Sequence, residues 1–257
     1  MTAAPRRRPL AGSLRLLTWN IHKGIGGIDR RYDLDRIAAV VAHYRPDVLA
    51  LQEVDVGVPR SRGHAQHERL ADALGFAHVA FAATHQLKVG HYGNAILSRV
   101  PLAKVESIDL TFPLKKTRAA LHAELIVPRG PHHLRVHLFN WHLGLAGVER
   151  RWQVTRLLSR RRVQRLGSTS RVVIAGDTND WAGALPGGQL GREGFTCVTG
   201  TGRRALKTFP AWAPVGALDR VFVRGPIDAT HVARPRTELA RVASDHRPLL
   251  IDLQLSR

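Results

Sequence analysis

Residues 14–20 read LRLLTWN, an apolar run that ends in a single amide side chain. Successive residues of an extended chain point to opposite faces, so Leu14, Leu16, Thr18 and Asn20 share one face of the strand that this run predicts. A short apolar run with little polar interruption is typical of a buried strand. The run therefore predicts that Asn20 lies at the carboxyl end of a strand inside a sheet.

Three further apolar runs end in residues that can carry chemistry, namely Glu53, His142 and Asp177. Alternation along each run predicts which residues lie on the same face as that last side chain. The predicted groups are Leu49, Leu51 and Glu53; Leu138, Asn140 and His142; and Val173, Ala175 and Asp177.

Two more polar segments, Leu218-Asp219 and Ser244-Asp245-His246, precede predicted strands at 220–223 and 248–253. If these two strands run antiparallel to the others, their first residues lie at the edge where the other strands end. Ligands of open α/β sheets bind at such carboxyl edges, so this edge is the predicted active site. The residues expected there are Asn20, Glu53, His142, Asp177, Asn179, Asp219, Asp245 and His246.

The rest of the chain alternates between predicted helices and strands. We expect helices from about Asp33 to His43, from His67 to Leu74 and over 147–166, and strands at 78–84, 94–98, 102–110, 118–128, 134–140 and 171–175. This mixture favours the α/β class, with two packed mixed sheets flanked by helices, over a TIM barrel or a purely parallel sheet. Residues 14–257 are predicted to form a single catalytic domain behind a flexible basic tail at 1–13.

The composition limits the classes of protein that the chain can belong to. Its 257 residues are 44% hydrophobic, enough for one sizeable core. The single cysteine, Cys197, excludes an internal disulfide and a zinc finger. The sequence has no apolar run of about 18 residues, so we expect no integral membrane segment and a cytoplasmic, monomeric protein.

The charge balance points to an anionic partner, because 39 basic and 20 acidic residues give a formal net charge of +19. Nucleic acid, an anionic lipid surface and a small phosphorylated molecule all fit this charge. The alternative is that the charge reflects composition and serves solubility alone.

Turn formation is the competing explanation for these polar residues, since Asp or Asn after a strand is often a turn former or helix cap. Turn formation is a sufficient explanation for Asn20 and for Asp219 when each residue is considered alone. It gives no reason for Glu53, His142 and His246. Asn, Glu and Asp are hard oxygen ligands that suit Mg²⁺, with Mn²⁺ as the alternative metal. Glu53 is the predicted anchor of that metal, assisted by Asn20 and Asp245.

Seven segments resemble, in order, the signature blocks of the endonuclease/exonuclease/phosphatase superfamily. They are Thr18-Trp19-Asn20-Ile21, Leu51-Gln52-Glu53-Val54, Gly93-Asn94-Ala95-Ile96-Leu97-Ser98-Arg99, Asn140-Trp141-His142-Leu143, Gly176-Asp177-Thr178-Asn179, Leu218-Asp219-Arg220-Val221 and Ser244-Asp245-His246-Arg247-Pro248. The resemblance extends from about Leu14 to Leu253. It implies a four-layer α/β/β/α sandwich and Mg²⁺-dependent hydrolysis of phosphoesters.

The resemblance also implies a role for each site residue. Glu53 would hold the metal with Asn20 beside it and Asp245 in its environment, and Asp177 would orient or deprotonate the attacking water. His246 would be a second acid/base or transition-state stabiliser whose ring another carboxylate orients. His142 would pair with Asp219 and face the phosphate or the leaving group.

Histidine at 142 resembles the deoxyribonuclease and sphingomyelinase side of the superfamily, because the abasic-site repair enzymes use tyrosine in that role. Asn94 stands where deoxyribonucleases carry a carboxylate. We expect Asn179, Asn94 and Arg118 to bind the substrate phosphate, although a surface position is the alternative for Arg118.

The predicted function is a Mg²⁺-dependent phosphodiesterase that uses direct attack by water. Its substrate would be a nucleic acid, a phospholipid or a small phosphoester, and it would work in the cytoplasm or at an anionic membrane surface. The alternative is a catalytically silent protein that binds phosphate or nucleic acid on the same fold.

Overall fold

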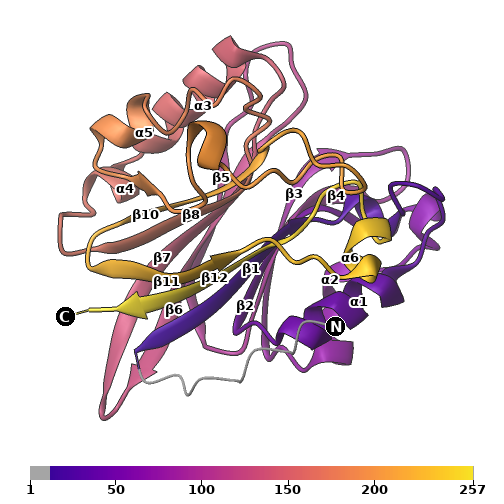
Figure 1. The fold of residues 1–257 in the computed structure, drawn as a ribbon, viewed down its shortest axis with the longest axis horizontal. Coiled ribbons are helices and arrows are strands. Elements are labelled where there is room, and N and C mark those ends of the chain that lie inside the picture. The colour runs from indigo at the N-terminus through magenta and orange to yellow at the C-terminus, as the bar shows by residue number, and fades with distance from the viewer. Residues whose placement is uncertain (1–11, 257) are drawn as a thin grey trace.

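Two mixed sheets pack face to face, and helices cover both outer faces (Figure 1). The computed structural model describes residues 12–256, so most of the predicted tail at 1–13 lies outside the described residues. Within them the first sheet has the order β11 (Ile227–Ala233), β12 (Leu249–Leu255), β1 (Ser13–Asn20), β2 (Val48–Val56), β4 (His91–Ser98) and β3 (His78–Gln86). The second has the order β5 (Leu102–Asp109), β6 (Ala119–Arg129), β7 (His132–His142), β8 (Arg171–Asp177), β10 (Asp219–Arg224) and β9 (Thr196–Cys197).

Each sheet is built around one parallel pair of strands. β1 pairs with β2 and β7 pairs with β8, and a helical connection joins the strands of each pair. The neighbours β12 and β10 run antiparallel to β1 and β8. The starts of β10 and β12 therefore lie at the edge where β1, β2, β7 and β8 end, as the sequence predicted.

Apolar side chains fill three layers among the described residues. Leu16, Ala50, Leu138 and Val173 lie in the layer between the two sheets. A second layer joins the first sheet to α1 (Leu34–Tyr44), α2 (Gln66–Leu74) and α6 (Glu238–Val242). The third joins the other sheet to α3 (Gly147–Leu158), α4 (Arg161–Gln164) and α5 (Gln189–Arg192). This arrangement confirms the predicted four-layer α/β/β/α sandwich.

The helices follow the local signals of the sequence in two cases out of three. Asp33 caps α1 by accepting the backbone N–H groups of Asp35 and Arg36, and α2 ends at Gly75 in the left-handed conformation. The prediction of one helix over 147–166 is wrong. Arg160 has an extended backbone (ψ 132°), and this break separates α3 from α4. In the part of the chain that the structure describes, no helix has the length and apolar character needed to span a bilayer.

Candidate active site

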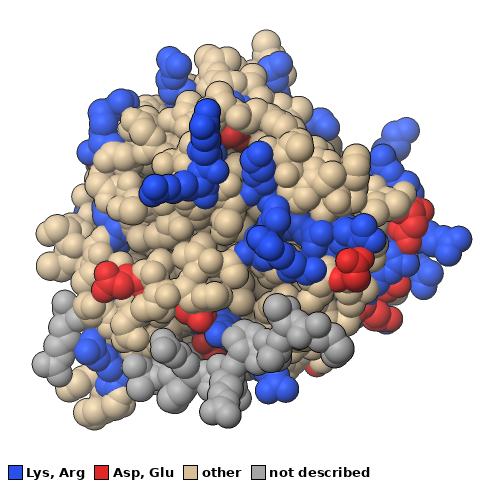
Figure 2. Space-filling view, viewed as in Figure 1, with Lys and Arg blue, Asp and Glu red and all other residues tan. Residues whose placement is uncertain are grey.

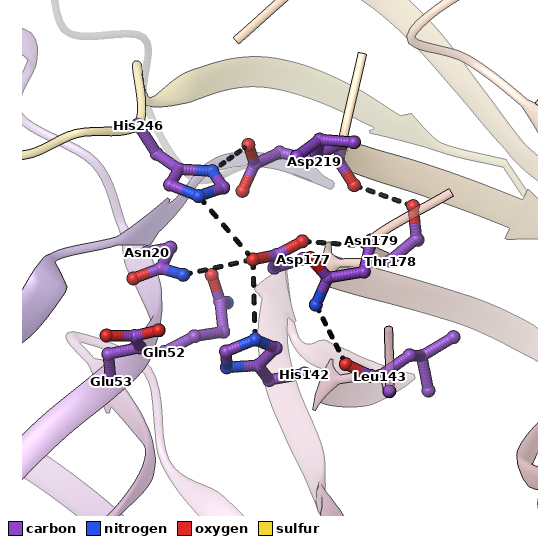
Figure 3. Close-up of polar contacts among 12 residues, drawn as sticks. Asn20, Gln52, Glu53, His142, Leu143, Asp177, Thr178, Asn179, Asp219 and His246 are labelled. Atoms are coloured by element: carbon purple, nitrogen blue, oxygen red, sulfur yellow. Dashed lines mark hydrogen bonds and ion pairs between the residues drawn. The ribbon is translucent and has the colours of Figure 1, made fainter. Parts of the chain in front are cut away.

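Asp177, the last residue of β8, lies at the centre of the predicted site (Figure 3). Its Oδ2 atom accepts a hydrogen bond from Asn20 Nδ2 at 3.0 Å. The same oxygen lies 3.4 Å from His142 Nε2 and 3.7 Å from His246 Nε2. Residues from β1, β7 and β8 and from the segment just before β12 thus meet at one carboxylate, as the strand-end pattern predicted.

The turn after β8 fixes the orientation of this carboxylate. The backbone N–H of Asn179 donates to Asp177 Oδ1 at 2.9 Å, while its side chain donates to the Leu143 carbonyl at 2.9 Å. Thr178 donates to the Leu218 carbonyl through its backbone N–H at 2.8 Å and its hydroxyl at 2.6 Å. Both oxygens of Asp177 therefore have fixed partners. The Asn179 amide, predicted to bind phosphate, is engaged with Leu143.

Polar contacts fix both the ring and the backbone of His246. Its Nδ1 atom lies 2.7 Å from Asp219 Oδ2, and its backbone carbonyl accepts the indole N–H of Trp19 at 2.7 Å. Burial alone would lower the pKa of His246, but the carboxylates of Asp219 and Asp177 outweigh it and raise the pKa to about 10. The imidazole is therefore protonated at neutral pH.

The predicted pairing of His142 with Asp219 is wrong. β8 lies between β7 and β10, and the register places His142 opposite Asp177 and Asp177 opposite Asp219. His142 and Asp219 are thus two strands apart, roughly 10 Å in the hydrogen-bonding direction. Asp219 is instead the carboxylate that orients His246.

His142 has the opposite charge state. Burial and the nearby positive charge of Arg118 lower the pKa of His142 to about 4, against the attraction of Asp177 and Glu53. Its Nδ1 atom is buried and finds no hydrogen-bond partner among residues 12–256. The site therefore holds one neutral and one cationic imidazole around a single carboxylate.

Glu53 reaches the site through a β-bulge. Leu49 and Leu51 pack on the helix side of the first sheet, so the prediction that Glu53 shares their face is wrong. The register of β2 against β4 shifts between Leu51 and Val54, and Glu53 has a left-handed backbone (φ 58°). This extra residue turns the Glu53 carboxylate into the cleft beside Asn20 (Figure 3).

The charge of Glu53 is balanced inside the protein. Burial would raise the pKa of its carboxyl, but the Lys23 ammonium, which contacts it directly, holds the pKa well below its usual range. Glu53 is thus an ionised carboxylate in a largely buried position.

Two predicted site residues have partners elsewhere. Asn94 is buried and donates from Nδ2 to the Ala119 carbonyl at 3.0 Å, which ties β4 to β6. The Asp245 carboxylate lies 3.7 Å from His22 Nε2 and accepts a hydrogen bond from the Ser244 hydroxyl at 3.4 Å. Neither side chain is among those that line the cleft.

The cleft above these groups has a volume of about 380 Å³. Arg118 lines it, and within the described residues the buried Nε of Arg118 has no acceptor, which leaves its guanidinium available to an anion. Several other residues that line the cleft were not predicted from the sequence, and they are Lys23, Arg60, His85, Leu87, Tyr92, Lys116, Thr117 and Leu145. Tyr92 stays a neutral phenol, because burial and the negative charge of Glu53 raise its pKa.

The oxygen donors at this edge fit a divalent cation. Ligand atoms of Asp177, Asp219 and His246 lie within 4.8 Å of one another. A metal there would have to displace the proton that the carboxylates of Asp219 and Asp177 favour on His246, because a metal requires the neutral imidazole. Glu53 and Asn20 are the better pair, since they offer an ionised carboxylate and an amide oxygen, and a cation, Lys23, already contacts Glu53.

Comparisons with known proteins identify the family of the chain. A model described as the endonuclease/exonuclease/phosphatase family matches residues 17–246. The uncharacterized protein YbhP of Escherichia coli (strain K12) is 31% identical over 254 residues, which are 95% of this chain and 97% of that protein.

Solved structures share the fold at lower identity. An endonuclease/exonuclease/phosphatase from Beutenbergia cavernae DSM 12333 is 24% identical, with a TM-score of 0.74 over 95% of this chain and 72% of that one. D. rerio TDP2, solved with a single-strand DNA product, is 22% identical, with a TM-score of 0.67 over 94% of this chain and 98% of its own. The family match spans both sheets and every strand end of the site, and the chain therefore belongs to the endonuclease/exonuclease/phosphatase family, whose members are generally metal-dependent phosphoester hydrolases.

Proposed function

We propose that this protein is a Mg²⁺-dependent phosphodiesterase in which water attacks the phosphorus directly. The observation that carries the proposal is the single carboxylate of Asp177 shared by Asn20, neutral His142 and cationic His246. Opposite protonation states on two neighbouring imidazoles are what acid/base work at one phosphate requires. A turn or a core contact has no need of them.

The chain's own groups divide the work. Asp177 orients the water and accepts its proton while the P–O bond to the leaving oxygen breaks and an alkoxide departs, and cationic His246, held by Asp219, stabilises the negative charge that grows on the phosphate. The free guanidinium of Arg118 binds two phosphate oxygens as a fork. A divalent ion held by Glu53 and Asn20 would supply Lewis-acid charge at the phosphate. Asp245, which lies beside His22, would act on that ion through its charge alone.

The substrate class follows from the charge of the cleft. Arg118 and Lys116 line it and make no ion pair within the described part of the chain, so an anionic substrate fits best. Nucleic acid is supported by the net charge of +19 and by the DNA product bound to the related fold of TDP2. An anionic phospholipid or a small phosphoester satisfies the same site.

Hydrolysis of bis(p-nitrophenyl) phosphate, single- and double-stranded DNA, RNA and phospholipid vesicles, each with Mg²⁺, Mn²⁺ or chelator, tests the proposal. Glu53→Gln, Asp177→Asn and His246→Gln should each lower the rate by about 10²-fold or more. Asp72→Asn and His133→Gln change the same residue types at exposed positions and should leave it unchanged.

Activity that persists in chelator would contradict the metal dependence, and activity that persists in both Glu53→Gln and His246→Gln would show that the site is elsewhere. A wild-type protein that binds DNA but hydrolyses no substrate in the panel would favour the silent binding protein.

A further inference from the structure

The Lys23 ammonium lies against the carboxylate of Glu53, which the proposed metal would need as a ligand. Its ammonium contacts Glu53 Oε2, and the two side chains are only 19% and 15% exposed. Tyr92 lies over the ammonium, with 5.6 Å between Nζ and the centre of the ring. The pair is thus largely withdrawn from water.

The backbone is arranged to hold Lys23 in this position. His22 and Lys23 both have left-handed dihedrals, with φ of 47° and 63°, which non-glycine residues adopt at a cost. The Lys23 carbonyl accepts a hydrogen bond from Gln66 Nε2 at 2.6 Å, which anchors the loop to α2. A long, flexible lysine side chain is therefore aimed at one carboxylate by a strained and anchored loop.

The charge on Glu53 explains why such a group is needed. A carboxylate largely removed from water is strongly destabilising unless a positive charge compensates it. Among the described residues, Lys23 is the only basic side chain that forms an ion pair with Glu53. A divalent ion on the same carboxylate would supply this compensation itself, and it would repel the ammonium.

We propose that Lys23 is an internal counter-ion of Glu53 that a divalent cation must displace, so that the chain itself sets the metal concentration at which the site becomes active. This inference rests on the proposed function, because it concerns the metal of the same site. It gives Lys23 a regulatory role that is separate from contact with substrate.

Metal binding to the purified full-length chain, measured by calorimetry with Mn²⁺ and Mg²⁺, tests the inference without any substrate. Lys23→Met keeps the length of the side chain and removes its charge. We expect it to bind metal about tenfold more tightly, the change that ~1.4 kcal/mol produces. Lys116→Met removes a charge from the same cleft without touching Glu53 and should change the affinity far less. Equal or weaker binding by Lys23→Met would overturn the inference.

Thermal unfolding gives a second readout. In chelator, Lys23→Met should melt below the wild type, and saturating Mn²⁺ should remove the difference. In a Glu53→Gln background the lysine substitution should no longer destabilise the protein, because the carboxylate that Lys23 balances is gone. A Lys23→Met chain that stays unfolded in saturating metal would also overturn the inference.

These outcomes are separable from the test of the proposed function. Tighter metal binding by Lys23→Met in a protein that hydrolyses no phosphoester would sustain the counter-ion role and remove the hydrolase. Normal hydrolysis with unchanged metal affinity in Lys23→Met would sustain the hydrolase and remove the counter-ion role. Failure of metal to bind either protein would remove both.

Discussion

At the scale of single residues, the site depends on two histidines that the fold treats differently. Both lie against Asp177, yet only His246 has a second carboxylate, Asp219, on its other nitrogen. His142 has Arg118 nearby instead, and the positive charge opposes its protonation. The Asp219 carboxylate on one ring, and burial beside a positive charge on the other, give the two histidines opposite charge states.

Asp219→Asn tests this division of charge. His246 is protonated below about 10 in the wild type, so its acid form persists over the neutral range. Loss of the Asp219 charge should lower that pKa toward the ordinary value of about 6.5, and the alkaline limb of the pH–rate profile should move down with it. NMR titration of the His246 ring and kcat/KM against pH would both show the shift.

The stability of the protein should also depend on pH through the titration of His246. Because folding raises the pKa of His246, its protonated form stabilises the fold fully below about pH 6.5, and the contribution is lost as pH rises toward 10. Asp219→Asn should therefore destabilise the protein at pH 7 and have little effect near pH 11. An alkaline limb and a stability profile that both stay in place would contradict the assignment.

At the scale of strands and sheets, the close packing of neighbouring strand ends positions the residues of the site. Gly176 shows how closely β8 packs against β7. Its φ is +134°, and a Cβ atom there would lie 2.1 Å from the Trp141 carbonyl oxygen. Only glycine allows β8 to approach β7 this closely next to Asp177. The sequence signature Gly176-Asp177 thus has a geometric cause.

Gly176→Ala should therefore abolish activity and destabilise the protein by about 1–3 kcal/mol from backbone strain alone. Gly167→Ala, at a position with open space around its Cα, is the matched control and should be close to neutral. Urea unfolding and the phosphodiesterase assay measure the two effects. An active, stable Gly176→Ala protein would mean that the β7–β8 contact tolerates expansion.

A buried amide pair connects the two sheets below the site. Gln52 Nε2 donates to Asn140 Oδ1 at 2.7 Å, and Asn140 Nδ2 donates to the carbonyls of Leu51 and Ala95 at 2.8 and 2.9 Å. Asn140→Leu should lower the free energy of unfolding by roughly 1–3 kcal/mol for each buried group left unpaired. The double variant with Gln52→Leu should recover part of this loss, and a loss equal to the sum of the single changes would argue against coupling.

The strand ends were predictable because they depend on local alternation, and those of Asn20, His142 and Asp177 are confirmed in the structure. Two features were not predictable by this route. The bulge that turns Glu53 into the cleft breaks the period on which the prediction rested, and no turn residue marks it. The pairing of Asp219 depends on sheet order, because β8 separates it from His142, and sheet order is a long-range property that local pattern does not contain.

At the scale of the whole molecule, positively charged side chains outnumber negatively charged ones. Figure 2 shows Lys and Arg side chains over much of one face, with a group near α6, and few acidic side chains between them. This matches the formal charge of +19. Such a surface attracts a polyanion before any contact with the cleft forms.

The affinity for single-stranded DNA should consequently fall steeply as salt rises. Displaced counter-ions contribute a slope of about −0.7 per neutralised phosphate for a single strand, so three contacts would cost roughly tenfold or more between about 50 and about 200 mM salt. Lys116→Met should make this slope shallower by about one contact, whereas the KM for bis(p-nitrophenyl) phosphate, which carries a single charge, should respond far less. Fluorescence anisotropy with labelled DNA measures the slope. If DNA affinity were flat across this range, the excess of arginine and lysine would have no part in substrate capture, and the small phosphoesters would become the better substrate class.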